Sequence, residues 1–528
     1  MFYLPSIPAS GEDVQLMMAP FGLIAHQVLR KHGESFTATF HSLLLFAPPF
    51  LGAVVFRTTI TALEAWTLSF GIYWGALLLS LTIYRASPFH RLGCYPGPIL
   101  CRLTGLRMVL ASLGYRPHVY LQALHEQYGD IVRIGPNELS VRDPLFVAPL
   151  YSFNGLLHRS RYMGDNVNAK EASRRGIADY KKWTSALAPA ALQNYRALLA
   201  ARVHQLLESI GNQEKEIDIS RWVHCFSYDF MTDVAFGGGS EFMRQNDAAD
   251  VWCKLEHDQR NSRTTPRSVQ HGRPGLTAAQ HLKLQYMRDV ISQRRQAAIA
   301  GPPLADDTLL AVIAGADVIS STLTSLIFCL LTHPRVCMRL QEEIDRFYPP
   351  GEDPCNTQPP QDMHYLTAVI NEVLRLYPPL PNGSRRMIPR DCPGIRIGSS
   401  FIPPGATISV HTYSMQRDPR SFHPCSTSFW PDRWLLASGR LSFEDARVDE
   451  YSFVHNQTAF TPFSYGLTNR VGERLAMQEL RIVLCAILQR YELRMGARWS
   501  PEMYMREYRE HSAKICPPSI PVVVCLRP

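Results

Sequence analysis

Residues 461–488 of this 528-residue chain read TPFSYGLTNRVGERLAMQELRIVLCAIL, and this stretch decides the fold. It begins as an irregular segment, since Gly466 and Gly472 are typical of turns and loops. Beyond Gly472 the apolar residues recur at helical spacing, which predicts a last long helix over about 472–490. The sequence therefore places a loop that carries Arg470 directly before a long helix.

Two further motifs lie upstream of this loop. Glu372-Val373-Leu374-Arg375 falls in a predicted helix over 365–377, where residues three apart share a face and can pair. Taken alone, such a pair is usually a solvated surface pair. FWPDRW at 429–434 then supplies Arg433, which predicts a buried triad with Glu372 and Arg375. Buried charged triads tend to fix a geometry rather than to add net stability.

Helical periodicity dominates the chain from about residue 95 onward. Short segments rich in β-branched residues, bounded by Gly and Pro, interrupt it. We predict helices over 118–128, 190–210, 220–235, 276–299, 308–332 and 334–346, a β-hairpin over 131–141, and strands around 395–402 and 407–411.

This order of motifs resembles that of the cytochrome P450 haem-thiolate monooxygenases, and looks like their membrane-bound fungal branch. The resemblance covers roughly residues 95–500. It implies a mainly α fold with a small β subdomain, a cytochrome P450-like fold behind an N-terminal membrane anchor. IAGAD at 313–317 looks like the oxygen-binding helix that crosses the haem. By the same resemblance, the residues implied to contact haem are Trp183, Arg386, Phe463 and Gly466.

Arg470 occupies the position at which this family places the cysteine that binds the haem iron. Electron donation by that thiolate favours O–O cleavage. An arginine side chain is effectively always protonated and has no lone pair to offer a metal. Cys485 lies roughly 22 Å beyond Arg470 along the predicted helix, and Cys425 lies before the loop, so neither is at the ligand position. The resemblance implies haem as the cofactor, whereas this position predicts no metal ligand and makes haem binding doubtful.

Other positions depart from the family pattern as well. Val318 and Ile319 follow Asp317 where the family usually has two threonines, and Ser185 replaces an expected arginine. The region 252–307 is short, although substrate-covering helices are expected there. Asp317 is the one candidate catalytic acid. Left unpaired in a pocket, its carboxyl would have a raised pKa; the alternative is a polar contact to the backbone.

The N-terminal region predicts a membrane anchor. Residues 65–84 contain no charge and are long enough to span a bilayer core of roughly 30 Å. Residues 35–56 are a possible second span, and 14–29 suit an interfacial helix. We expect an anchor region over 1–94 and a P450-like domain over 95–528, held at the endoplasmic reticulum with the large domain cytosolic. The orientation follows from basic residues beyond the span, namely Arg85, Arg91, Arg102 and Arg107.

Charge and cysteine usage exclude several other classes of protein. The net charge is +8, yet the basic residues are spread along the chain, so we expect no nucleic-acid partner. The 12 cysteines show neither C-x-x-C spacing nor a Cys/His cluster with zinc-ligand spacing. We therefore predict free thiols in a reducing compartment, with no disulfide framework and no metal site.

The sequence supports competing functions. The first is a family member of secondary or xenobiotic metabolism that is inactive as a monooxygenase and binds a hydrophobic small molecule or a partner enzyme. The second is an active haem monooxygenase that oxidises a hydrophobic metabolite with electrons from an NADPH-dependent reductase. A third, a cyclisation or isomerisation without haem, has no positive support in the sequence. An error in the gene model or sequence at codon 470 or in 252–307 would restore the second function.

Overall fold

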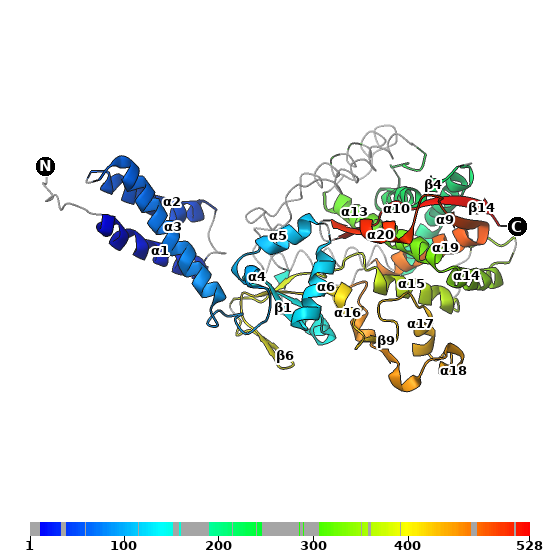
Figure 1. Cartoon of the computed structure of the whole chain (residues 1–528). Coiled ribbons are helices and arrows are strands. Elements are labelled where there is room, and N and C mark those ends of the chain that lie inside the picture. The colour runs from blue at the N-terminus through cyan, green and yellow to red at the C-terminus, as the bar shows by residue number, and fades with distance from the viewer. Residues whose placement is uncertain are drawn as a thin grey trace. The chain divides into compact units, whose positions relative to one another are not determined.

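The computed structural model of the chain is drawn in Figure 1. It describes the chain except for residues 1–10, 33–37, 59, 115, 152–157, 160–188, 214, 239, 245–284, 286–288, 290–305, 350, 357–360, 391, 466–471, 512–513 and 528. The chain divides into two compact units, Met1–Arg107 with Arg133–Asn137, and Met108–Val132 with Glu138–Pro528. Our predicted boundary between residues 94 and 95 stays a prediction.

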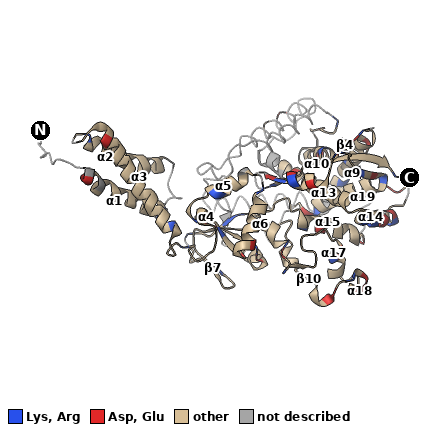
Figure 2. Ribbon diagram, in the orientation of Figure 1, with Lys and Arg blue, Asp and Glu red and all other residues tan. Residues whose placement is uncertain are grey.

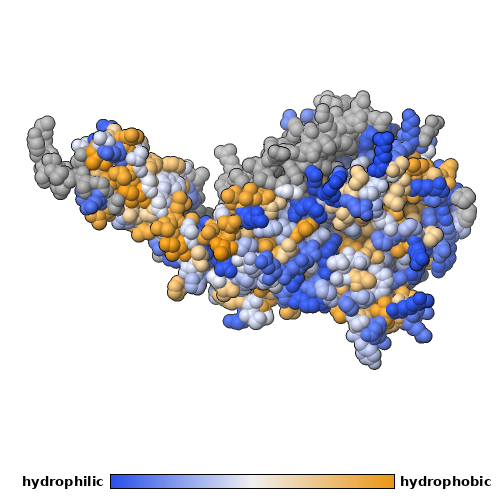
Figure 3. All heavy atoms as spheres, viewed as in Figure 1, coloured by the Kyte–Doolittle hydropathy of each residue, from blue (hydrophilic) through white to orange (hydrophobic). Residues whose placement is uncertain are grey.

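The first unit is built on three helices, α1 (Gly11–His32), α2 (Ala38–Phe56) and α3 (Ala62–Ala86). A capping box starts α3, because the Thr61 side chain accepts from the Glu64 backbone while the Glu64 carboxylate accepts from the Thr61 backbone. The small core of the unit includes Met18, Ala65, Tyr73 and Leu77. Apolar side chains also cover much of its outer surface (Figure 3), and few charged residues lie along the three helices (Figure 2).

Three described helices are long and apolar enough to cross a membrane, by length and composition: Thr39–Phe56 in α2, Ala62–Ala86 in α3, and Gly315–Thr332 in α13 (Asp306–Thr332). The α13 segment is 78% buried inside the protein, whereas the α2 and α3 segments are 22% and 17% buried. The α13 segment is therefore part of the protein core. Helix α3 contains the predicted span 65–84, and α2 contains the described part of the span 35–56, so both are compatible with an anchor.

Helices make up most of the second unit (Figure 1). The longer ones are α9 (Pro189–Gly211), α10 (Ile219–Phe236), α13, α14 (Pro334–Phe347), α15 (His364–Leu376) and α19 (Glu473–Arg490). The shorter ones are α6 (Pro117–Tyr128), α7 (Val147–Tyr151), α16 (Thr412–Met415), α17 (Asp432–Ala437), α18 (Phe443–Ala446) and α20 (Pro501–Glu507). Further short helices are α4 (Ile99–Leu103) in the first unit, α5 (Leu106–Leu113), and the 3-10 turns Pro144–Phe146, Glu450–Ser452 and Gln457–Ala459.

The strands form small sheets. In the largest, β2 (Glu138–Val141) pairs in parallel with β8 (Thr407–Val410), which pairs antiparallel with β5 (Arg386–Met387), and β5 with β3 (His158–Arg159). A second sheet has the order β11 (Tyr491–Met495), β14 (Pro521–Leu526), β4 (Ile217–Asp218). The two-stranded sheets pair β12 (Arg509–His511) with β13 (Lys514–Cys516), β6 (Ile395–Ile397) with β7 (Ser400–Ile402), and β9 (Phe422–His423) with β10 (Val454–His455). The remaining strand is β1 (Ile131–Gly135).

Helix α13 runs through the main core because apolar residues surround its axis, as expected of a buried helix. Its buried residues include Ala316, Leu323, Leu326 and Cys329, which belong to one apolar cluster that also contains residues of α10, α15 and α19. Helix α10 is fixed at both ends: Asp218 caps its first turn, and Gly237 closes it in the left-handed conformation at φ 73°. The structure thus confirms the predicted mainly α class with small sheets. The predicted helix over 276–299 lies outside the described residues.

Candidate functional site

The structure brings Glu372, Arg375 and Arg433 together in the core. All three side chains are fully buried. Arg375 donates to both carboxylate oxygens of Glu372 at 2.9 and 2.8 Å, and Arg433 donates from Nε at 3.1 Å. The indole of Trp434 and the backbone N–H of Trp430 add bonds of 3.0 Å to the same carboxylate. Burial by itself raises the pKa of Glu372, but the two guanidinium groups outweigh it, and the pKa is lowered.

The triad also fixes the irregular segment that follows α16. Arg375 Nη1 donates to the carbonyl oxygens of Gln416 at 2.7 Å and Ser426 at 2.5 Å. Arg433 Nη2 donates to the carbonyl oxygens of Pro424 and Cys425 at 2.9 and 2.7 Å. These bonds hold residues 416–433 against α15. The three charged side chains therefore fix the backbone of this segment.

Asp317 lies on α13 and is 8% exposed. The Tyr228 hydroxyl of α10 donates to Oδ1 at 2.7 Å, and the Lys514 ammonium of β13 forms an ion pair with Oδ2. We expected either an unpaired carboxylate or a contact to the backbone, and both expectations were wrong. A tyrosine from one neighbouring helix and a lysine from a hairpin hold the carboxylate. The catalytic role of Asp317 stays a prediction.

The serines that follow on α13 point to different neighbours. Ser320 Oγ lies 3.3 Å from Nδ1 of His224 on α10, and it donates to the Asp317 carbonyl at 3.2 Å. Ser321 Oγ is buried and has no hydrogen-bond partner among the described residues. A separation of about 100° per residue around the helix accounts for the two directions. Ser320 thus joins Asp317 in a polar contact between α10 and α13.

Arg386, one of the predicted haem contacts, lies on β5 and is 3% exposed. Its guanidinium carbon lies 5.0 Å from the ring centre of Tyr151, within the range of a cation–π contact. Tyr151 is itself held, because its hydroxyl donates to the Ser384 carbonyl at 2.8 Å. Phe463 is half-buried and packs against the main apolar cluster. The predicted site residues Trp183, Gly466 and Arg470 lie outside the described residues.

Glu479 is a buried acid that we did not predict from the sequence. It lies on α19, directly after the loop, and is 1% exposed. Its Oε1 has no hydrogen-bond partner among the described residues, and burial raises the pKa of this carboxyl well above its ordinary value. The signal in the sequence that could have revealed Glu479 is a single acidic residue among the apolar residues that recur along this helix.

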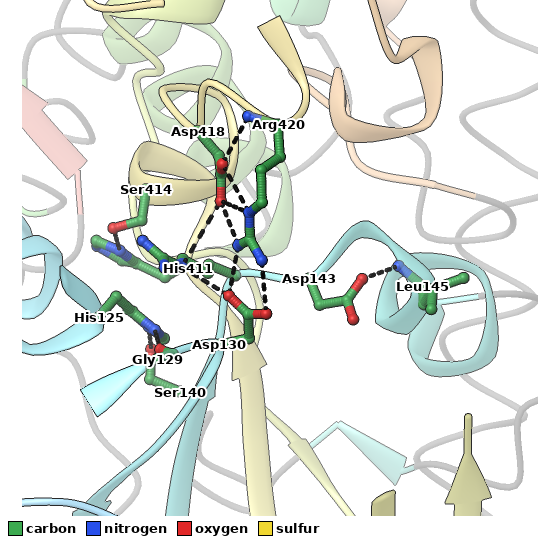
Figure 4. A network of polar contacts seen from close by, with 11 residues as sticks. His125, Gly129, Asp130, Ser140, Asp143, Leu145, His411, Ser414, Asp418 and Arg420 are labelled. Carbon is green, nitrogen blue, oxygen red and sulfur yellow. Dashed lines mark hydrogen bonds and ion pairs between the residues drawn. The ribbon is translucent and has the colours of Figure 1, made fainter. Parts of the chain in front are cut away.

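A second network that we did not predict joins α6, β2 and the segment after α16 (Figure 4). Arg420 donates to Asp130 and to Asp418, and Arg142 adds a bond of 2.9 Å to Asp130. The hydrogen bonds from Arg420 lower the pKa of Asp130 to about 2.

Beside this network, His125 of α6 lies between the Gly129 carbonyl, 3.0 Å from Nδ1, and Ser140 Oγ, 2.8 Å from Nε2 (Figure 4). The ring of His411 stacks on it with centroids 5.7 Å apart. Burial lowers the pKa of His125 to about 4 and that of His411 well below its ordinary value. Both rings are therefore neutral at pH 7, and this cluster is a structural support of the sheet.

Comparisons with known proteins place these features in one family. Residues 287–515 match the family model for cytochrome P450. Cytochrome P450 monooxygenase FCK2 of Fusarium pseudograminearum is 30% identical over 458 residues, which cover 80% of this chain and 79% of that protein. Cytochrome P450 monooxygenase orf5 of Eupenicillium brefeldianum is 27% identical over 463 residues, covering 81% and 90%. The chain therefore belongs to the cytochrome P450 family, and these relatives are fungal.

The solved structures support the same fold. The crystal structure of the cytochrome P450DA heme domain matches with a TM-score of 0.56 at 17% identity, covering 80% of this chain and 94% of that one. At this identity the likeness concerns the fold alone. The predicted family, its fungal type and the predicted fold class are all confirmed.

Haem is the cofactor of this family, and the predicted ligand position of this chain does not fit a thiolate-bound haem. Arg470 occupies the ligand position in the sequence. Cys485 is fully buried inside α19, where burial raises the pKa of its thiol to about 12. Cys425 is exposed and lies in the segment that the triad fastens. Neither cysteine lies at the predicted ligand position, and the loss of haem binding stays a prediction.

Proposed function

We propose that this chain is a membrane-anchored cytochrome P450 that is inactive as a monooxygenase. The observation that carries the proposal is Arg470, a permanent cation at the position where the family has a thiolate. Without that thiolate the electron donation that favours O–O cleavage is missing. The altered positions Ser185, Val318 and Ile319 support the proposal, since several losses at separate positions that the family uses for haem and oxygen are typical of relaxed selection.

The proposed role that remains is binding. The folded core retains its triad and its apolar cluster, so the chain is suited to hold a hydrophobic small molecule of secondary or xenobiotic metabolism, or a partner enzyme. The proposed location is the endoplasmic reticulum membrane, with the large unit on the cytosolic side. Helices α2 and α3 support a membrane location by length and composition.

A second candidate function is an active haem monooxygenase that receives electrons from an NADPH-dependent reductase. It is favoured by the relatives at 30% and 27% identity, both of which are named as monooxygenases. Sequencing the transcript across codon 470 and residues 252–307 separates the two candidates at the outset, because a cysteine at codon 470 would support the second.

Haem content and reductase-dependent turnover test the proposal. The full-length chain and Arg470→Cys are purified in detergent after expression with a haem precursor, and haem per chain and NADPH oxidation with a fungal reductase are measured. We expect little haem and no turnover in the unmutated chain, and a gain of both in the variant. Haem content and NADPH oxidation that are well above background in the unmutated chain and equal to those of the variant would overturn the proposal.

A further inference from the structure

Three side chains with metal-ligating atoms meet away from the site described above. His204 lies on α9, while Asp353 and Cys355 lie in the connection between α14 and α15. One ligand atom from each falls within 4.8 Å of the others. Asp353 Oδ2 is 3.0 Å from His204 Nε2. The set offers one nitrogen, one oxygen and one sulfur.

The geometry points to a zinc site formed by His204, Asp353 and Cys355, which the spacing rules applied to the sequence did not reveal. Zn²⁺ takes this mixture of donors in tetrahedral coordination, whereas Mg²⁺ and Ca²⁺ prefer oxygen alone. With bonds of the usual lengths, tetrahedral ligand atoms lie roughly 3.4 to 3.7 Å apart. The ligand atoms would have to move by on the order of 1 Å to reach these distances.

The carboxylate is already oriented by its own loop. Asp353 Oδ1 accepts the backbone N–H of Cys355 at 2.9 Å, which leaves Oδ2 directed at His204. Such hydrogen bonds behind a ligand set its orientation and contribute to metal affinity. Burial, followed by the negative charge of Asp353, raises the pKa of the Cys355 thiol to about 12. Binding of Zn²⁺ would replace the thiol proton, which passes to solvent.

The loop that carries two of the ligands is tied to both neighbouring helices. Gln489 of α19 donates to the Glu352 carbonyl at 2.8 Å, and Arg196 of α9 donates to the Asn356 carbonyl at 3.0 Å. The ligand-bearing backbone is therefore positioned before any metal arrives.

Access and burial also suit a three-ligand site. The side chains of His204 and Asp353 are 45% and 30% exposed, whereas Cys355 is buried. The exposed side leaves a fourth position for water, as in open zinc sites. An exposed His–Asp pair alone contributes little to stability; a metal bound here would fasten α9 to the connection between α14 and α15.

Cobalt spectroscopy on the full-length chain tests the site. The purified protein is treated with a chelator, kept reduced with a phosphine, and titrated with Co²⁺. We expect a thiolate-to-cobalt charge-transfer band that saturates at about one equivalent and disappears on adding Zn²⁺. His204→Ala and Cys355→Ser should each weaken Zn²⁺ binding at least about tenfold.

Matched controls separate this site from adventitious binding. His364→Ala removes the histidine of another exposed His–Asp pair, His364 with Asp362 at 3.8 Å, and Cys337→Ser removes a different cysteine. Both should leave the titration unchanged. A titration without the charge-transfer band, or a band that persists in Cys355→Ser, would overturn the inference. If Cys355→Ser fails to fold, unchanged Zn²⁺ affinity in the partly exposed His204→Ala variant would overturn it equally.

Discussion

At the scale of single residues, the informative positions are those at which a charge lies inside the protein. Asp317 and Lys514 are 197 residues apart in sequence and form an ion pair in the fold. No local pattern predicts such a pair, because nothing near Asp317 marks a hairpin lysine as its partner. The Glu372–Arg375 pair was predictable, since its residues lie one helical turn apart. The chemistry of Asp317 therefore depends on tertiary contacts, and the triad depends partly on local ones.

Removing Lys514 should destabilise the fold. In Lys514→Met the Asp317 carboxylate stays buried and, among the described residues, keeps the Tyr228 hydroxyl alone, a loss of about 2–4 kcal/mol in the free energy of unfolding. Thermal unfolding of the full-length protein measures it, with Lys215→Met, an exposed lysine, as the control. The double variant Asp317→Asn/Lys514→Met should recover part of the loss. A Lys514→Met protein as stable as the control would show that the pair contributes nothing.

Glu372→Gln should cost more stability than any surface carboxylate. The amide leaves Arg375 and Arg433 buried without a counter-charge, which costs about 3–5 kcal/mol. The matched control is Glu492→Gln, because Glu492 pairs with Arg494 at the surface, where both are largely exposed. That control should change stability by less than about 0.5 kcal/mol. Comparable midpoints for the two variants in denaturant titrations would contradict the role given to the triad.

At the scale of elements, the long helices and the strands around 131–141, 395–402 and 407–411 were predictable, and the two-residue strands were not. The helix predicted over 190–210 is α9 at Pro189–Gly211, and that over 220–235 is α10 at Ile219–Phe236, since each shows several turns of periodicity. Strands such as β3 and β9 contain two residues each, too few for an alternating pattern. They exist because a partner strand from a distant segment supplies hydrogen bonds.

The histidines beside the largest sheet predict a pH dependence. His125 has a pKa of about 4 in the fold against 6.5 in the unfolded chain, so below pH 6.5 the unfolded state binds the proton first. Its contribution to stability is complete above pH 6.5 and is lost as the pH falls toward 4, and His411 changes stability in the same direction. Asp130 adds a further loss below its ordinary pKa of 3.8.

The melting temperature measured between pH 7.5 and 4 tests this dependence. It should fall steadily below pH 6.5, and the fall should be shallower in His125→Gln, which removes one of the two neutral rings. An identical slope in the variant and the unmutated protein would show that His125 is not among the groups responsible.

At the scale of the whole molecule, the chain has the family fold, and we propose that its haem-ligand position is changed. The family and the fold class followed from the order of a few motifs, since each motif marks a buried or irregular position that the fold requires. The binding role did not follow from them, because the region 252–307 lies largely outside both the readable sequence pattern and the described residues. Loss of oxygen chemistry is the central claim, and it depends on one side chain.

The reduced carbon-monoxide difference spectrum of the full-length protein, recorded beside that of Arg470→Cys, tests this claim most directly. An arginine at the ligand position cannot bind the iron through sulfur, so the unmutated chain should give no band of a thiolate-ligated carbonyl complex. The cysteine variant should give that band, because the folded core and the triad are retained. A thiolate-type band in the unmutated chain would contradict the account.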